Sequence, residues 1–354
     1  MSVAIHLVTW NGAQYLPYFL TTLKQQSFQD FELFVLDNGS TDETPKIIER
    51  GRGIFSQPVH VSYNARNVGF AKGYNQLLRQ SDADMQLIVN QDVIFSDLCL
   101  ETLVRFMCWH AEASAVAPFL MRWNFNATAG KKAADKIDAV GLKAYRNRRV
   151  VEWLAGLPPD DDALTVIAKA SSNKIIETFG VSGALALFRR QALLDVAFAD
   201  GAVFDETYGS YKEDVDLAYR LKSMGHKTFI ARDAIACHIR GGASANNLSD
   251  ISGARHKRTQ PLSLRKTSYV NHLATLYKNE YWQNFFLDFP WIFWYEWKKF
   301  MYFLLFDREV LGGLRDAWAK RRELKEKREW IIKKRKMKWN EMRQMFWIHD
   351  RGPE

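Results

Sequence analysis

LIVNQDVIF, residues 87–95, places Asn90 and Asp92 inside an otherwise apolar run. A carboxylate in such a run incurs a large desolvation penalty unless it is paired, bound to a cation or placed at the end of a strand. The stretch therefore predicts a buried strand over residues 85–90. It also raises the question of what Asp92 does directly after that strand.

The sequence around this stretch alternates between strand patterns and helix patterns. The expected strands and helices follow one another at 3–10, 16–26, 31–37, 45–50, 59–64, 70–80 and 85–90, strand first. Near-continuous apolar strands separated by amphipathic helices are typical of a mostly parallel sheet that is covered on both faces. The first 95 residues thus predict a Rossmann-like α/β fold.

Polar residues follow each of the four predicted strands. The clusters are Thr9 to Asn11, Asp37 to Ser40, Asn64 to Asn67 and Asn90 to Asp92. Any one of them is compatible with an ordinary turn, because Asn, Asp, Gly and Ser dominate loops. Four clusters in register favour a ligand site, since ligands of open α/β sheets bind beyond the carboxyl ends of the strands.

The common nucleotide-binding motifs are missing from these turns. The first strand-to-helix turn, TWNGAQYL at 9–16, lacks the GxGxxG of dinucleotide-binding folds, and no GxxxxGK[ST] occurs. NVGFAKGYN, residues 67–75, instead places Gly69 and Gly73 at the start of a predicted helix, whose N-terminal amides suit a phosphate group. Two glycines equally permit close helix packing, so this loop alone does not distinguish a phosphate site from a packing contact.

Composition indicates a globular protein of a reducing compartment. The chain has 354 residues, 47% of them hydrophobic, which is enough for one large or two ordinary domains. Cys99, Cys108 and Cys237 form no CxxC pair and no disulfide framework, so binding of a metal by thiolates is not expected. The opening MSVAIHLVTW lacks the pattern of a secretory signal.

Beyond residue 122 the expected elements are a polar insertion or loop region at 122–175, a strand at 177–190, a helix at 214–224 and a strand at 227–231. Glu213, Asp214 and Asp216 crowd the first turn of that helix, and the helix dipole accounts for only one or two acids there. His238 follows the last strand. A lone histidine is more often a packed or surface side chain than a ligand.

As an ordered set, seven motifs resemble those of family 2 glycosyltransferases, the inverting enzymes of the GT-A fold, and most closely their rhamnosyltransferase-like branch. The motifs are VTWNG, LDNGSTDET, NVGFAKGYN, VNQDV, VSGALAL, FDETYGSYKEDVDL and CHIRG. They cover roughly residues 1–110 and 177–242. The resemblance implies a GT-A catalytic domain over 1–245, in which 1–95 bind the nucleotide and 177–242 serve the acceptor and the catalysis.

The resemblance answers the question raised by Asp92. NQD, residues 90–92, occupies the place of the family's DxD motif, whose last carboxylate holds a divalent cation against the donor diphosphate. Asp92 is the implied metal ligand, and His238 is its implied second protein ligand. A carboxylate, an imidazole and phosphate oxygens suit Mn²⁺ or Mg²⁺. The cation would stabilise the negative charge that accumulates on the leaving diphosphate.

The same resemblance assigns catalytic and donor-binding roles. Asp214 in KEDVDL matches the catalytic base, and the neighbouring Glu213 is expected to raise the proton affinity of the pair. The residues implied to bind the nucleotide sugar are Thr9, Asn11, Asp37, Asn38, Asn67, Gly69, Asn90 and Gly183. Two positions depart from the family pattern: Gln91 stands where proline is common, and residues 208–211 vary the aromatic pair before the ED.

The last third of the chain differs in composition. YWQNFFLDFPWIFWYEWKKFMYFLLF, residues 281–306, is rich in aromatic residues but interrupted too often by charges and proline for a transmembrane span. Residues 307–354 hold 15 Lys and Arg against 9 Asp and Glu. Together they predict that residues 260–354 form an α-helical extension lying on an anionic membrane surface. The alternative is a helical hairpin that closes the catalytic core or makes a homodimer contact.

These observations predict an inverting glycosyltransferase that is cytoplasmic and peripheral on the cytoplasmic face of a membrane. It would move a sugar, rhamnose from dTDP-rhamnose by resemblance, to a membrane-displayed saccharide or polyprenyl-linked acceptor in cell-surface polysaccharide synthesis. One rival is a sugar nucleotidyltransferase, whose glycine-rich basic loop is missing from TWNGAQYL. Another is a catalytically inactive membrane-bound scaffold. No nucleic-acid partner is expected, since no binding module accompanies the basic tail.

Overall fold

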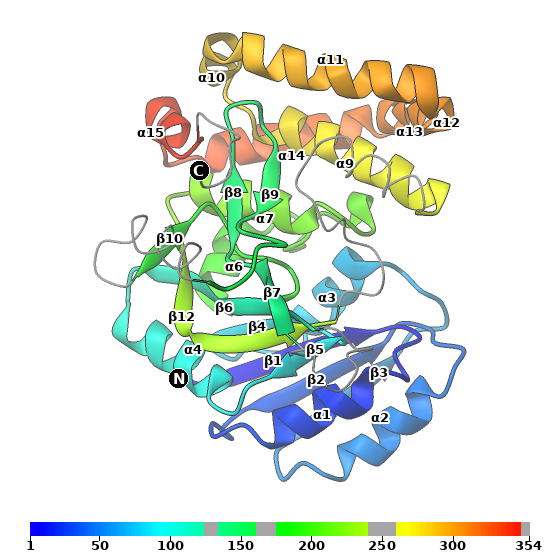
Figure 1. Ribbon diagram of the computed structural model, residues 1–354, viewed down its shortest axis with the longest axis vertical. Coiled ribbons are helices and arrows are strands. Elements are labelled where there is room, and N and C mark those ends of the chain that lie inside the picture. The colour runs from blue at the N-terminus through cyan, green and yellow to red at the C-terminus, as the bar shows by residue number, and fades with distance from the viewer. Residues whose placement is uncertain (124–133, 161–174, 240–259, 348–354) are drawn as a thin grey trace.

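The computed structural model describes residues 1–123, 134–160, 175–239 and 260–347, and its centre is one large mixed sheet (Figure 1). The strands run in the order β10-β12-β6-β11-β4-β1-β2-β3, with β5 paired to β12 and β7 paired to β6. The pairs among β4, β1, β2 and β3 are parallel, whereas β11 is antiparallel to both of its neighbours. The predicted mixed α/β architecture with a mostly parallel first half is confirmed.

The first half of the sheet follows the predicted alternation closely. Its elements are β1 (Val3–Thr9), α1 (Leu16–Lys24), β2 (Glu32–Asp37), α2 (Thr44–Arg52), β3 (Val59–Tyr63), α3 (Phe70–Leu78) and β4 (Met85–Asn90). Successive strand residues point to opposite faces. Ile5 and Leu7 therefore pack under α1 and α2, whereas Ala4 packs with Leu77 of α3 on the other face.

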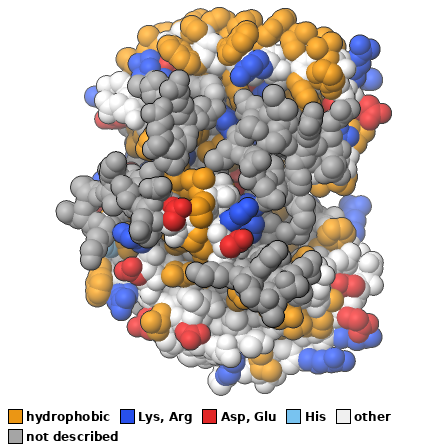
Figure 2. All heavy atoms as spheres, viewed as in Figure 1, with side chains coloured by type: hydrophobic (Ala, Val, Ile, Leu, Met, Phe, Trp, Pro, Cys, Tyr) orange, Lys and Arg blue, Asp and Glu red, His pale blue; other side chains and the backbone are white. Residues whose placement is uncertain are grey.

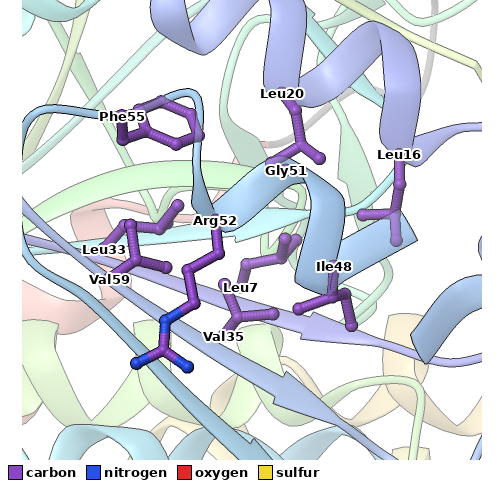
Figure 3. A pocket seen from close by; sticks show the side chains of 10 residues that line it. All are labelled: Leu7, Leu16, Leu20, Leu33, Val35, Ile48, Gly51, Arg52, Phe55 and Val59. Atoms are coloured by element: carbon purple, nitrogen blue, oxygen red, sulfur yellow. The ribbon is translucent and has the colours of Figure 1, made fainter. Parts of the chain in front are cut away.

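A small apolar gap lies between α1, α2 and strands β1 to β3 (Figure 3). Apart from Arg52 and Gly51, its lining consists of apolar core side chains. Gly51 of α2 lies so close to α1 that a Cβ there would be 2.4 Å from Leu20 Cδ1. The gap belongs to helix-on-sheet packing, and Arg52 is the one charged side chain among the described residues that line it.

The second half of the sheet continues through β5 (Val93–Phe95), α4 (Cys99–Trp109), β6 (Ala113–Trp123), β7 (Ala134–Ala139), β8 (Leu142–Ala144), β9 (Val150–Glu152), β10 (Ile176–Thr178), β11 (Leu185–Arg189), α6 (Arg190–Val196), the short 3₁₀ helix η2 (Glu206–Tyr208), α7 (Glu213–Ser223) and β12 (Lys227–His238). β12 bends at an irregularity between Ala231 and Ile235 and then runs on to His238. This continuation carries His238 alongside β5.

Two sequence-based expectations for this half are wrong. The described part of 122–175 is not loop: β7, β8 and β9 lie in it, with Ile137 and Val140 in the core. The single strand expected over 177–190 is two strands, β10 and β11, separated by a turn that contains Gly183. Both errors have one cause, since short antiparallel strands depend on partners far away in the sequence rather than on their own pattern.

The C-terminal region is helical, as predicted, and consists of α9 (Leu262–Asn279), α10 (Trp282–Leu287), α11 (Phe289–Phe306), α12 (Arg308–Leu311), α13 (Gly313–Ala319), α14 (Arg321–Lys334) and α15 (Trp339–Gln344). Figure 1 shows α9 and α14 between α7 and the outermost helix α11. The expected domain boundary near residues 245–260 falls largely outside the described residues, as do 348–354 at the end of the extension.

A buried network of ion pairs joins this extension to α7 and the residues before it. Lys278 of α9 pairs with Asp205 and, at 2.9 Å, with Asp216 of α7. Asp216 also pairs with Arg220 at 2.9 Å, and Lys327 of α14 reaches Asp205 at 2.6 Å. Burial alone would raise the pKa of Asp205, but the two lysines lower it well below its usual value. Removing one member would leave a buried charge uncompensated.

The outer face of α10 and α11 carries exposed rings, and we call it the aromatic surface. Its exposed members are Trp282, Phe285, Phe286, Phe289, Trp291, Phe293, Trp294 and Trp297. Figure 2 shows hydrophobic side chains gathered along the edge of the molecule where α10 and α11 lie. The inner face of α11 packs on α9 through Phe303 and Tyr269, whose ring centroids are 4.8 Å apart. None of the helices in the described ranges combines the length and the apolar character needed to cross a bilayer.

Candidate active site

The predicted polar clusters meet at one edge of the sheet because their strands end side by side. Thr9 of β1 lies opposite Asp37 of β2, and Val8 of β1 lies opposite Asn90 of β4. Parallel strands in this register bring their carboxyl ends to a common edge. The position expected for a ligand in such a sheet is therefore lined by the clusters that the sequence singled out.

Hydrogen bonds connect the first two clusters. Ser40 Oγ donates to Asp37 Oδ1 at 2.5 Å and accepts from the Asn11 backbone at 2.9 Å. Asn11 adopts a left-handed conformation with φ 47°, and its side-chain oxygen accepts from the Thr41 backbone at 2.9 Å. Thr9 is buried, and its hydroxyl donates to the side chain of Gln91 at 2.5 Å. Gln91, the departure in the NQD triplet, thus fastens that triplet to the first turn.

Asn38 shapes the loop at 67–69. Its amide nitrogen donates to Asn67 Oδ1 at 3.0 Å and to the Gly69 carbonyl at 3.3 Å, while its oxygen accepts from the Val68 backbone at 3.0 Å. Gly69 has φ 87°, and a Cβ there would lie 2.8 Å from the Gly209 carbonyl oxygen. Asn38 is consequently engaged within the protein, whereas Asn67 is exposed at the rim and Gly69 is the N-cap of α3.

Asp92 and His238 are brought together by the pairing of β5 with β12. His238 lies opposite Val93 in that register, and its Nε2 is 3.1 Å from Asp92 Oδ1. The other ring nitrogen, Nδ1, is 2.9 Å from Asp138 Oδ2 of β7. Burial alone would lower the pKa of His238, but the charge of Asp92 and the hydrogen bonds to Asp138 and Asp92 raise it to about 10.

This arrangement fits a divalent cation. Asp138, which is fully buried, fixes the ring so that Nε2 faces the carboxylate of Asp92, as carboxylate partners commonly do for metal-binding histidines. Within the described ranges no point gathers three or more His, Cys, Asp or Glu side chains around one ion. Asp92 and His238 are a carboxylate and an imidazole, groups of the kinds that Mn²⁺ accepts, and phosphate oxygens and water would have to complete the coordination of such an ion.

Asp214 and Glu213 begin α7 in different environments. Asp214 is half-buried, and it accepts from the Val215 backbone at 2.8 Å and from the Gly183 backbone at 3.4 Å. Glu213 is only 7% exposed. Burial and then the charge of Asp214 raise the pKa of Glu213 to about 8. At pH 7 Glu213 holds its proton, so Asp214 is the member of the pair that is suited to accept one.

The turn at 183–184 connects the NQD triplet to the acids of α7. The Asn90 backbone donates to the Ala184 carbonyl at 2.9 Å, and the adjacent Gly183 donates to Asp214. A side chain at Gly183 would lie 3.4 Å from Asp214 Cβ. The structure thus brings the three groups of residues that the sequence singled out, the strand-end clusters, Asp92 with His238 and the acids of α7, around one edge of the sheet.

Sequence reasoning missed Asp138. Its signal was available, because KIDAVG, residues 136–141, places a carboxylate inside an apolar run just as LIVNQDVIF does. The polar composition of residues 122–175 predicts a loop, which hides this carboxylate. Arg240 to Gly242, the end of the CHIRGG stretch, lies outside the described residues.

Two curated rhamnosyltransferases are similar to this chain in sequence. The N-acetylglucosaminyl-diphospho-decaprenol L-rhamnosyltransferase of Mycobacterium tuberculosis is 23% identical over 265 residues, which cover 71% of this chain and 80% of that protein. The O-antigen chain rhamnosyltransferase RfbN of Salmonella typhimurium is 26% identical over 183 residues, covering 45% of this chain and 56% of that protein.

Solved structures share the fold. GalNAc-T7, crystallised with UDP, GalNAc and Mn²⁺, gives a TM-score of 0.57 at 12% identity, covering 78% of this chain and 48% of that one. The mannosyltransferase PcManGT of Pyrobaculum calidifontis, in complex with GDP-Man and Mn²⁺, gives 0.50 at 18% identity, covering 90% and 74%. The model of the family described as Glycosyl transferase family 2 matches residues 4–196, more than half of the chain. The chain therefore belongs to family 2 of the glycosyltransferases.

Proposed function

We propose that this glycosyltransferase transfers rhamnose from dTDP-rhamnose, with inversion, to a polyprenyl diphosphate-linked saccharide in cell-surface polysaccharide synthesis. The observation that carries the proposal is the pair Asp92 and His238, backed by Asp138 and connected through residues 183–184 to Asp214. The two rhamnosyltransferase relatives support the donor and the class of acceptor. In this proposal residues 1–95 bind the nucleotide, 177–242 serve the acceptor and 260–354 form the extension.

The donor would lie along the edge formed by β1, β2 and β4. Thr9, Asn11 and Asp37 would line the nucleoside site, where Ser40 and Gln91 already hold them in place. Asn67 and Gly69 would lie near the diphosphate, because the N-terminus of α3, which Gly69 caps, favours an anion. Asn90 and Gly183 would flank the sugar, and Asn38 would act through the loop that it shapes.

Asp92 and His238 would hold Mn²⁺ or Mg²⁺, which supplies charge neutralisation for the departing diphosphate. Without a cation, both ring nitrogens of His238 hold protons, Nδ1–H donating to Asp138 and Nε2–H donating to Asp92. With a cation bound, Asp138 would keep the proton on Nδ1 and leave the lone pair of Nε2 to the ion. Asp214 takes the proton of the acceptor hydroxyl as that oxygen attacks the anomeric carbon, which is general-base catalysis. Glu213 remains neutral beside it, so that the two acids do not both carry charge.

The aromatic surface would hold the enzyme at the cytoplasmic face of the membrane that displays the acceptor. Exposed Trp and Phe rings are suited to the boundary between headgroups and acyl chains. Exposed basic residues such as Lys298 and Arg308, on and next to α11, complement an anionic leaflet. A homodimer formed through the same surface is the alternative occupant, and sedimentation of the full-length protein without lipid distinguishes the two.

The test of this function is a donor screen with full-length protein in Mn²⁺. We expect dTDP-rhamnose to raise the melting temperature and to release dTDP when N-acetylglucosaminyl-diphospho-decaprenol is added. A donor at 100 times its Kd adds about 2.7 kcal/mol to the free energy of unfolding. Preference for UDP or GDP sugars would overturn the donor assignment. Release of pyrophosphate from dTTP and a sugar phosphate would favour the nucleotidyltransferase, and binding without turnover would favour the scaffold.

A further inference from the structure

The segment that leads into the catalytic acids has a backbone conformation that its residues disfavour. Gly209, Tyr211 and Lys212 have φ angles of 66°, 70° and 71°, and the last two carry side chains. Left-handed conformations are uncommon for residues with a Cβ and persist only where the surroundings enforce them. Lys212 directly precedes Glu213 and Asp214, so the direction of this segment sets where Asp214 lies.

One side chain of the helical extension holds this segment. Asn271 of α9 is 3% exposed, and its amide nitrogen donates to the carbonyls of Tyr208, Ser210 and Tyr211 at 3.0, 3.1 and 2.8 Å. One helical turn later, the hydroxyl of Thr275 lies 2.9 Å from Tyr208 Oη. These contacts fix the segment from the side of the extension.

The donor half holds the same segment from the opposite side. The Ala71 backbone at the start of α3 donates to the Gly209 carbonyl at 3.1 Å. Gly69 packs against that residue so closely that no Cβ fits between them. Residues 208–212 therefore sit between the loop expected to face the diphosphate and the amide of Asn271.

We propose that Asn271 is a positioning residue for proton transfer. Its amide holds residues 208–212 in the strained conformation that directs the carboxylate of Asp214 toward the acceptor hydroxyl. The inference rests on the proposed function, in which Asp214 receives the proton of that hydroxyl. It assigns the helical extension a part in catalysis in addition to the role proposed at the membrane.

The variants Asn271→Ala and Asn271→Asp, made in the full-length protein, test this. Each removes the donors, and the aspartate also places negative charge against three carbonyl oxygens. We expect kcat to fall about 10- to 100-fold, as a small misplacement of a catalytic group does, with donor KM and the donor-induced thermal shift unchanged. Hydrogen exchange over peptides 205–216 should rise in both variants, and this readout needs no substrate.

Asn284→Ala is the matched control. Asn284 of α10 is equally buried, and its amide donates to the Trp339 carbonyl at 2.8 Å, away from the segment. It should lower the melting temperature without changing kcat or exchange at 205–216. Equal losses of kcat in the control and in Asn271→Ala, or unchanged exchange at 205–216 in Asn271→Ala, would reduce Asn271 to a structural residue.

A double variant separates this inference from the proposed function. If Asn271 acts through Asp214, adding Asn271→Ala to Asp214→Asn lowers kcat no further, because the group being positioned is already disabled. Multiplicative losses would overturn the inference while leaving Asp214 as the base. An Asp214→Asn enzyme with full activity would instead overturn the base assignment itself, whatever Asn271→Ala does.

Discussion

At the scale of single residues, the arrangement of His238 between Asp92 and Asp138 would decide how the proposed cation binds. A ring nitrogen that faces a carboxylate holds a proton tightly, and the pKa of His238 is raised to about 10. A divalent cation at Nε2 must displace that proton, so its binding releases a proton. Asp138 matters because it fixes which nitrogen faces the ion.

Asp138→Asn should therefore weaken cation binding and leave the chemistry intact. We expect the Mn²⁺ concentration for half-maximal activity to rise about 10- to 100-fold, with kcat at saturating Mn²⁺ largely kept. Asp135→Asn, an exposed acid on the same strand, serves as the control and should change neither value. An Asp138→Asn enzyme with a normal Mn²⁺ requirement would show that Asp138 does not support the cation site.

Asp214→Asn should separate binding from turnover. The amide keeps the shape of the carboxylate but accepts no proton, so kcat should fall roughly 10²- to 10⁴-fold while the donor Kd is retained. Asp216→Asn, two residues on, should behave differently because Asp216 is buried in ion pairs with Lys278 and Arg220. There we expect a loss of stability in urea unfolding. The assignment fails if Asp216→Asn removes turnover while the fold survives.

Glu213 should make the stability of the protein depend on pH. Its pKa is raised from 4.5 to about 8 in the folded state, so the folded state keeps a proton that the unfolded chain loses. The stabilisation is complete below about pH 4.5 and declines as the pH rises toward 8. In Glu213→Gln this decline should be smaller. Urea unfolding of both proteins at pH 5 and pH 8 measures the difference, and parallel curves would contradict the raised pKa.

At the scale of elements, the aromatic surface can be tested apart from catalysis. Phe293→Ser and Trp297→Ser together interrupt the row of rings on α11. The centroids of these two rings are 5.9 Å apart. We expect flotation with anionic liposomes to be lost, while dTDP release by donor hydrolysis in detergent-free buffer stays unchanged. Trp109→Ser, on α4 and even more exposed, is the control. Wild-type protein that ignores liposomes and sediments as a dimer would favour the homodimer.

The elements also show how far the sequence could predict the molecule. The strands of the first half could be predicted because each buried strand carries its own apolar run and ends in a polar cluster, as LIVNQDVIF does. The site around Asp92 could be predicted only in part. Asp138 of β7 contacts His238, which lies 100 residues later in the chain, and Asn271 of α9 contacts Tyr208, which lies 63 residues earlier. No local sequence pattern encodes such distant contacts.

At the scale of the whole molecule, the helical extension and the α/β part of the chain share one interior. Lys278→Met tests this, because the change leaves Asp205 and Asp216 buried with one cation fewer. Breaking a buried pair in this way costs about 3–5 kcal/mol. Calorimetry should show one transition at a markedly lower temperature. Lys325→Met, an exposed lysine of α14, should change little. Two separate transitions in the wild-type protein would contradict a shared interior.

The same network sets an order of events during synthesis. Asp216 leaves the ribosome well before its partner Lys278, and Lys327, which completes the network, follows Asp216 by 111 residues. At about 5–20 residues per second, that interval lasts roughly 6–22 seconds. Before Asn271 and Lys278 are synthesised, residues 208–212 and the acids Asp205 and Asp216 lack these partners. The buried network of ion pairs is consequently complete only after α14 has been translated.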